Sequence, residues 1–116
     1  MYIIKKYFFI TGQESNKVSG VENVVSSRVR VLTREGLHGR PASQIATMLA
    51  KRKASLTLSR VDDPESKADG SSVLDMLIMA AGFNTDLQLI ARGPEAQELL
   101  AEVTDFFNNK FGEEEA

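Results

Sequence analysis

Residues 28–53, RVRVLTREGLHGRPASQIATMLAKRK, contain the change of pattern that decides the fold. In RVRVL, residues 28–32, apolar and charged residues alternate, which is the period of a half-buried β-strand. In ASQIATMLAKRK, residues 42–53, the apolar side chains recur at helical spacing instead. The apolar stripe consists of Ala42, Ile45, Met48 and Leu49. The stretch therefore predicts a strand, a turn at EGLHGRP and a helix with one buried face.

The two patterns continue through the middle of the chain. ASLTLSRV, residues 54–61, alternates as a second strand, and DDPESKADG, residues 62–70, is rich in turn-forming residues. This composition predicts a hairpin loop, although the segment after it is short for a full strand. SSVLDMLIMAAGFN, residues 71–84, predicts a short helix that ends near Gly82 or Asn84, since both residues tolerate a left-handed cap.

The C-terminal third predicts one more strand and the strongest helix. TDLQLIARG, residues 85–93, alternates through Leu87 and Leu89. GPEAQELLAEVTDFFNNKFG, residues 93–112, has Pro94 and Glu95 in the first helical turn. Its buried stripe comprises Ala96, Leu99, Leu100, Val103 and Phe107.

Each predicted helix has one apolar stripe, which needs a sheet face to cover it. The element order therefore favours an α+β open-faced sandwich, with a four-stranded antiparallel sheet and three helices on one face. We expect residues 28–112 to form this domain. Residues 1–27 are predicted to be an N-terminal extension, partly flexible with one strand at most, and residues 113–116 an acidic tail.

The composition excludes several classes of function. The chain has 116 residues, 42% of them hydrophobic and 26% charged, which fits a single globular domain. The net charge of -2 argues against a nucleic-acid partner. Without cysteine and with one histidine, the chain has no thiolate metal site, and we expect no metal and no cofactor. The longest uncharged apolar run near the N-terminus is YFFI, too short for membrane insertion, so we expect a cytoplasmic protein.

His38, the single histidine, precedes the first predicted helix. A lone histidine in this position is often only a surface or capping residue. Here, however, the N–H groups of Gly39 and Arg40 have no intrahelical acceptor and attract an anion, and Arg40 adds a guanidinium suited to phosphate. A neutral imidazole beside an anion site is a potential nucleophile toward phosphorus. No nucleotide-binding glycine loop accompanies it, so we expect a phosphoryl carrier that does not bind ATP.

The string GLHGRPAS resembles the active-site signature of HPr, the histidine-containing phosphocarrier of the bacterial phosphoenolpyruvate-dependent sugar phosphotransferase system. The similarity extends from about Val29 to Phe111, and the predicted element order matches the family fold. The resemblance implies that His38 accepts the phosphoryl group on Nδ1 and that Arg40 stabilises it. It also implies that the phosphoryl group comes from enzyme I and passes to EIIA-type sugar permease components.

A second landmark of the family is a regulatory serine at the start of the second helix. Alignment back from DLQLIARG assigns this role to Ser72, which implies HPr kinase/phosphorylase as a further partner. The alternative is that Ser72 or Ser71 is simply the N-cap. In the same helix, Val73, Leu74 and Leu77 are predicted to dock partner proteins, although a helix buried on both sides would show the same pattern.

Three functions remain open on this basis. The first is a monomeric phosphocarrier, which forms a phosphohistidine intermediate but is not a stand-alone enzyme. The second is a regulatory HPr-like protein that acts through Ser72 phosphorylation, with little or no role in sugar transport. The third, a hydrolase with His38 as base, is poorly supported because no nucleophile elbow is present. Departures from the family pattern at Thr47, Ala50 and Asp75 leave the partners open.

Overall fold

The computed structural model describes residues 2–4 and 23–113. In chain order these residues form β1 (Tyr2–Ile4), β2 (Val24–Arg30), α2 (Gly39–Ala50), β3 (Ser55–Arg60), β4 (Lys67–Asp69), α3 (Val73–Met79), β5 (Asp86–Arg92), α4 (Ala96–Asn108) and a final 3₁₀ turn (Lys110–Gly112).

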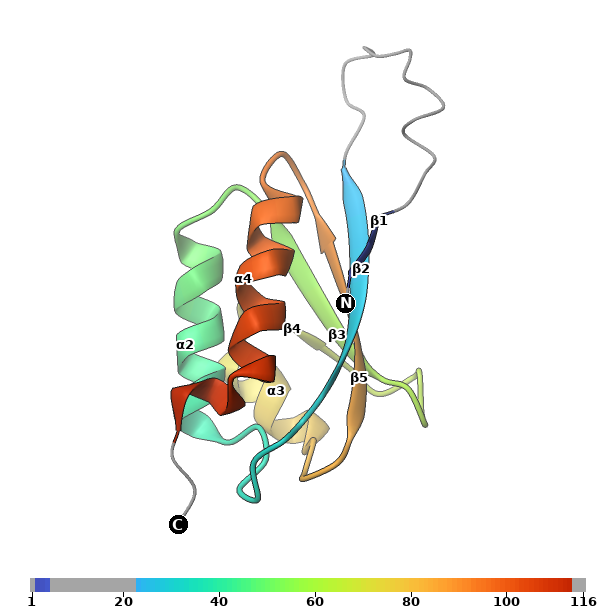
Figure 1. Cartoon of the computed structure of the whole chain (residues 1–116), viewed down its shortest axis with the longest axis vertical. Helices are drawn as coiled ribbons and strands as arrows, with labels where there is room; N and C mark the ends of the chain where they lie inside the picture. The colour runs from blue at the N-terminus through green and yellow to red at the C-terminus, as the bar shows by residue number, and fades with distance from the viewer. Residues whose placement is uncertain (1, 5–22, 114–116) are drawn as a thin grey trace.

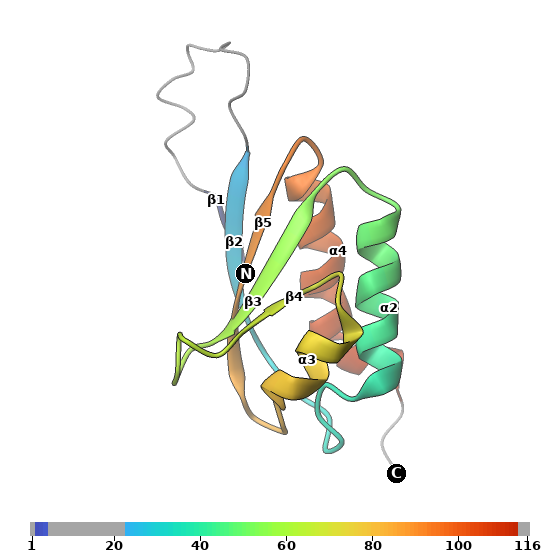
Figure 2. The same ribbon diagram turned by 180° about the vertical axis from the view of Figure 1, so that it is seen from behind.

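The strands form one sheet in the order β1-β2-β5-β3-β4, and every neighbouring pair is antiparallel. Helices α2, α3 and α4 lie on one side of it, and α3 contacts both α2 and the edge strand β4 (Figure 1). Among the residues that the structure describes, no helix covers the other face of the sheet (Figure 2). The predicted open-faced sandwich is confirmed for β2 to β5 and the three helices. The short strand β1 adds a fifth member at the β2 edge.

The core lies between the sheet and the helices. Alternate strand residues and the predicted helix stripes meet there, each less than 2% exposed: Val25, Leu56, Leu58, Leu87, Leu89, Ile45, Leu99, Leu100, Val103 and Phe107. Burial of this apolar surface is the main favourable contribution to the stability of the fold. It also fixes the starts of α2 and α3, where the site residues predicted from sequence are located.

Strand β2 begins at Val24, four residues before the predicted start at Arg28. The residues in between include Ser27, which faces the core with no exposed surface. Its hydroxyl hydrogen-bonds the buried hydroxyl of Thr104 in α4, at 2.9 Å. Each polar group thus has a partner, and the strand can continue through a serine that broke the apolar alternation.

Helix α3 ends at Met79, earlier than the predicted end near Gly82 or Asn84. The left-handed cap is Ala80, with φ 55°. The following residue, Ala81, is buried, and its carbonyl accepts a hydrogen bond from the backbone N–H of Leu37 at 2.9 Å. The chain must therefore reverse at Ala80 to bring Ala81 against the loop that precedes α2.

Candidate functional site

His38 is the N-cap residue of α2, with extended backbone angles (φ -93°, ψ -167°). Its carbonyl accepts the first helical hydrogen bond, from the N–H of Ala42 at 3.0 Å, while its side chain makes no capping bond. The imidazole therefore remains free for other contacts, and its side chain is 38% exposed.

The loop before His38 is held by a close backbone approach. Gly36 has φ +74°, and a Cβ there would lie 2.7 Å from the carbonyl oxygen of Ala81. Only glycine fits this position, because both the backbone angle and the contact exclude a side chain. With Leu37 buried beside it, the loop fixes where the helix begins and which way His38 points.

The start of α2 is open to solvent. The N–H groups of Gly39 and Arg40 lie in the first turn, where the helix offers them no acceptor. A Cβ added at Gly39 would meet no atom within 4 Å, so space for a bound group exists outside the backbone. The side chain of Arg40 is 68% exposed and lines the same surface hollow as His38. These are the groups that bind anions at helix N-termini in general.

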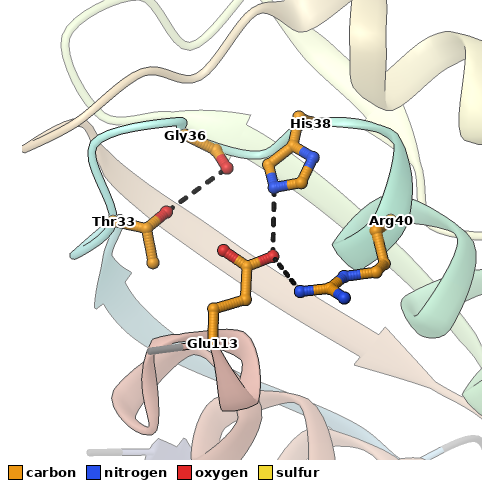
Figure 3. Close-up of polar contacts among 5 residues, drawn as sticks. All are labelled: Thr33, Gly36, His38, Arg40 and Glu113. Carbon is orange, nitrogen blue, oxygen red and sulfur yellow. Dashed lines mark hydrogen bonds and ion pairs between the residues drawn. The ribbon is translucent and has the colours of Figure 1, made fainter. Parts of the chain in front are cut away.

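Glu113 completes the cluster, and the sequence analysis did not anticipate it. Its Oε2 lies 3.0 Å from Nε2 of His38 and 3.5 Å from Nη2 of Arg40 (Figure 3). A carboxylate only accepts hydrogen bonds, so the facing Nε2 carries the proton. In the neutral ring Nδ1 is then the nitrogen with a free lone pair, and in Figure 3 it is on the side away from Glu113.

These side chains line a small surface hollow of about 250 Å³, together with Glu35. It is shallow and polar, whereas sites for small organic substrates are usually larger and mostly apolar. The hollow is open to solvent and combines the imidazole and the guanidinium with two carboxylates, and it gives a hydrolytic substrate no enclosed binding surface.

Ser72 belongs to a second, separate group of hydrogen bonds at the start of α3. It is the N-cap, and its Oγ accepts from the N–H of Asp75 at 3.0 Å. The neighbouring Ser71 donates its hydroxyl to Oδ1 of Asp69 at 2.8 Å. Ser72 thus has the capping role considered from the sequence, and the carboxylates of Asp69 and Asp75 lie close to the start of α3.

The predicted docking residues on α3 differ in exposure. Leu74 and Leu77 are 65% and 42% exposed, while Val73 is partly buried against the core. The sequence analysis did not include Ile78, 72% exposed, or Phe83, 53% exposed, among the docking residues. The inner face of α3 is formed by Met76 and Met79, so the helix has one buried and one open apolar side.

No group of three or more His, Asp or Glu side chains within residues 2–4 and 23–113 could hold a metal ion. None of the helices described is long and apolar enough to cross a membrane.

The structure is a small open-faced sandwich with a half-buried histidine at a helix N-terminus, and comparison with known proteins identifies its family. A model described as the PTS HPr component phosphorylation site matches residues 25–109. Phosphocarrier protein HPr of Treponema pallidum (strain Nichols) is 33% identical over 91 residues, which cover 78% of this chain and 100% of the relative. The chain therefore belongs to the HPr family of phosphotransferase-system phosphocarriers.

One further sequence relative and one solved structure are also similar to this chain. Phosphocarrier protein NPr of Escherichia coli (strain K12) is 28% identical over 90 residues, 78% of this chain and 98% of the relative. The crystal structure of HPr from Thermoanaerobacter tengcongensis has a TM-score of 0.69 at 21% identity, over 78% of this chain and 98% of that one. The second similarity supports the fold.

Proposed function

We propose that this protein accepts a phosphoryl group on Nδ1 of His38 from phospho-enzyme I and passes it to EIIA-type proteins. The observation that carries the proposal is the position of His38 at the open N-terminus of α2, with Arg40 beside it. Helix N–H groups and a guanidinium would hold the phosphoryl oxygens while the N–P bond remains available for transfer. The protein would act as a cytoplasmic monomer. Its phosphocarrier domain would be residues 28–112, extended by the start of β2 at one end and by Glu113 at the other.

The first test is incubation with phosphoenolpyruvate and catalytic bacterial enzyme I, followed by intact mass measurement. We expect one added phosphate that is lost in acid, absent from His38→Ala and retained in Ser72→Ala. A parallel reaction with phosphoramidate, a small donor that phosphorylates imidazoles without an enzyme, separates a failure of His38 from a mismatched enzyme I. Labelling that persists in His38→Ala, or no acid-labile phosphate from either donor, would refute the proposal.

The second candidate function is regulation through Ser72. It is favoured by the place of Ser72 at the start of α3, directly before the exposed apolar surface of Leu74, Leu77 and Ile78. A phosphate there would meet the helix N-terminus, but it would also displace the N–H of Asp75 and approach the carboxylates of Asp69 and Asp75. These carboxylates make Ser72 a poorer acceptor than a serine at a helix start without acidic neighbours.

HPr kinase with ATP tests this alternative. An acid-stable phosphate that disappears in Ser72→Ala and persists in Ser71→Ala would establish the regulatory site. Asp75→Asn should increase the rate of labelling, because it removes the nearest negative charge on the helix. If neither the parent protein nor Asp75→Asn gave an acid-stable product, the regulatory function would be refuted and only the carrier function would remain.

A further inference from the structure

Glu113 links two site residues from a position far along the chain. Glu113 follows the last 3₁₀ turn and is charged, so its side chain would be expected to face solvent. It is only 10% exposed. The same oxygen, Oε2, contacts the imidazole of His38 and the guanidinium of Arg40 (Figure 3). A carboxylate is rarely this buried unless it is paired, and here both partners belong to the phosphoryl site.

The backbone that delivers Glu113 is itself unusual. Lys110, Phe111 and Gly112 are three consecutive left-handed residues, with φ of 56°, 57° and 70°. For a bulky residue such as phenylalanine this conformation is strained, and it persists only where surrounding contacts hold it. Those contacts are visible: the Phe111 ring is buried against Phe106 and Phe107, with centroid distances of 5.2 and 5.0 Å.

We infer that Glu113 is a positioning residue for phosphoryl transfer, which holds the Nε2–H tautomer of His38 and compensates the charge that its ring acquires. The inference rests on the proposed carrier function and names a residue for it. The strained turn supports the inference independently of the contact, because it turns the chain so that this carboxylate faces His38.

The chemistry explains why a carboxylate helps at this point. The Nδ1 lone pair attacks phosphorus, and the donor's N–P bond breaks with its electron pair remaining on the donor nitrogen. Because Nε2 keeps its proton, the imidazole ring becomes cationic as the new N–P bond forms. Glu113 is placed at Nε2, where it stabilises that positive charge. Arg40 then exchanges part of its contact with Glu113 for the phosphoryl oxygens.

The test measures phosphorylation rate and ring tautomer in the full-length protein and four variants. Glu113→Gln keeps an oxygen that can accept from Nε2 but has no charge, and Glu113→Ala removes both. Phe111→Ala leaves the carboxylate in the chain but removes the packing that aims it. Glu98→Gln, on the exposed surface of α4, is the matched control. The rate is followed with phosphoramidate and with enzyme I, and the tautomer by ¹⁵N chemical shifts of the imidazole.

We expect Glu113→Gln to retain the Nε2–H tautomer and react roughly 5-fold more slowly, and Glu113→Ala to react roughly 10-fold more slowly with mixed tautomers. Phe111→Ala should resemble Glu113→Ala if circular dichroism shows it folded, and Glu98→Gln should match the parent. Unchanged or faster labelling of both Glu113 variants would overturn this inference and leave the carrier proposal intact. If neither donor labelled the parent, both the carrier proposal and the role of Glu113 would be overturned. If His38→Ala alone lost labelling, the carrier proposal would stand and the role of Glu113 would be refuted.

Discussion

Arg40 presents its guanidinium on the solvent side of α2, 3.5 Å from the carboxylate of Glu113. Its planar fork can bind two phosphoryl oxygens at once, which the point charge of a lysine cannot do. We predict that Arg40→Lys lowers the initial rate of His38 phosphorylation roughly 10-fold, because one charge-assisted hydrogen bond is worth about 1.5 kcal/mol. The measurement is the rate of acid-labile labelling at limiting enzyme I.

The control for this prediction lies just beyond the C-terminal end of α2. Arg52 pairs with Glu102 at 3.1 Å, away from the phosphoryl site. Arg52→Lys changes the same chemical group and should label at the parental rate. Equal slowing of both variants would show that the exchange of arginine for lysine acts generally and that the guanidinium of Arg40 has no specific role at His38.

Asp86 and Arg30 form a surface ion pair that shifts the pKa of the carboxyl. The Arg30 guanidinium, 2.7 Å away, lowers the pKa of the Asp86 carboxyl below its ordinary value, first through the hydrogen bond and then through its charge. A lowered pKa in the folded state stabilises the fold above the pKa of the unfolded chain. That contribution is lost as pH falls through the lower folded value.

We therefore predict that Arg30→Gln raises the pKa of Asp86 toward its ordinary value. The stability difference between variant and parent should be present at neutral pH and shrink as pH falls through the acidic range, since both proteins then bind the same proton. Carboxyl NMR titration gives the pKa, and urea unfolding at several pH values gives the stability difference. A pKa that stays low in Arg30→Gln would assign the shift to another group.

At the scale of the elements, the turn after α4 contains strain that can be removed. Lys110 is exposed and has φ 56°, a conformation that costs a residue with a Cβ about 1 kcal/mol and glycine almost nothing. We predict that Lys110→Gly stabilises the protein by about 0.5 kcal/mol, after the extra freedom of glycine in the unfolded chain is subtracted. Thermal unfolding measures the change.

Lys51, the C-cap of α2, supplies the comparison. It is also exposed, but its φ is -96°. Lys51→Gly therefore brings the entropic cost without relief of strain and should lower the melting temperature. A decrease in both variants would mean that the turn at Lys110 is not strained in solution.

The elements that the sequence predicts well are those whose buried residues are mostly apolar. Strands β3 and β5 and helix α4 were recognised because the residues that face the core are apolar and repeat with the period of the element. The start of β2 was missed because Ser27 is satisfied by Thr104, a partner that only the tertiary structure supplies. The end of α3 was misplaced because burial of Ala81 outweighs the local preference for glycine at the cap.

The site shows the same limit. His38 and Arg40 were predicted as site residues because the chemistry of a helix N-terminus follows from a short local motif, and the structure brings both to the start of α2. Glu113 gave no such signal, since an acidic residue in a run of glutamates after a helix usually faces solvent. Its role depends on three left-handed residues and on the packing of Phe111, and local periodicity reports neither of them.

At the scale of the whole molecule, one polar contact crosses the core between the first long strand and the last helix. The hydroxyls of Ser27 and Thr104 are 2.9 Å apart, with both residues at most 2% exposed. This pair connects segments 77 positions apart, so it contributes only when sheet and helix layers have both formed. Its strength is therefore a measure of the docking of α4 on β2, which in turn positions the turn leading to Glu113.

A double-mutant cycle measures that coupling. Ser27→Ala should destabilise the protein by about 1–3 kcal/mol, because the Thr104 hydroxyl is left buried without a partner, and Thr104→Val should cost a similar amount. The double variant removes both polar groups and should cost less than the sum of the two by about 1 kcal/mol, measured by urea unfolding. Strict additivity would mean that each hydroxyl finds another partner. The two layers would then be held by apolar packing alone, which includes the contact of Phe107 in α4 with Phe111 before Glu113.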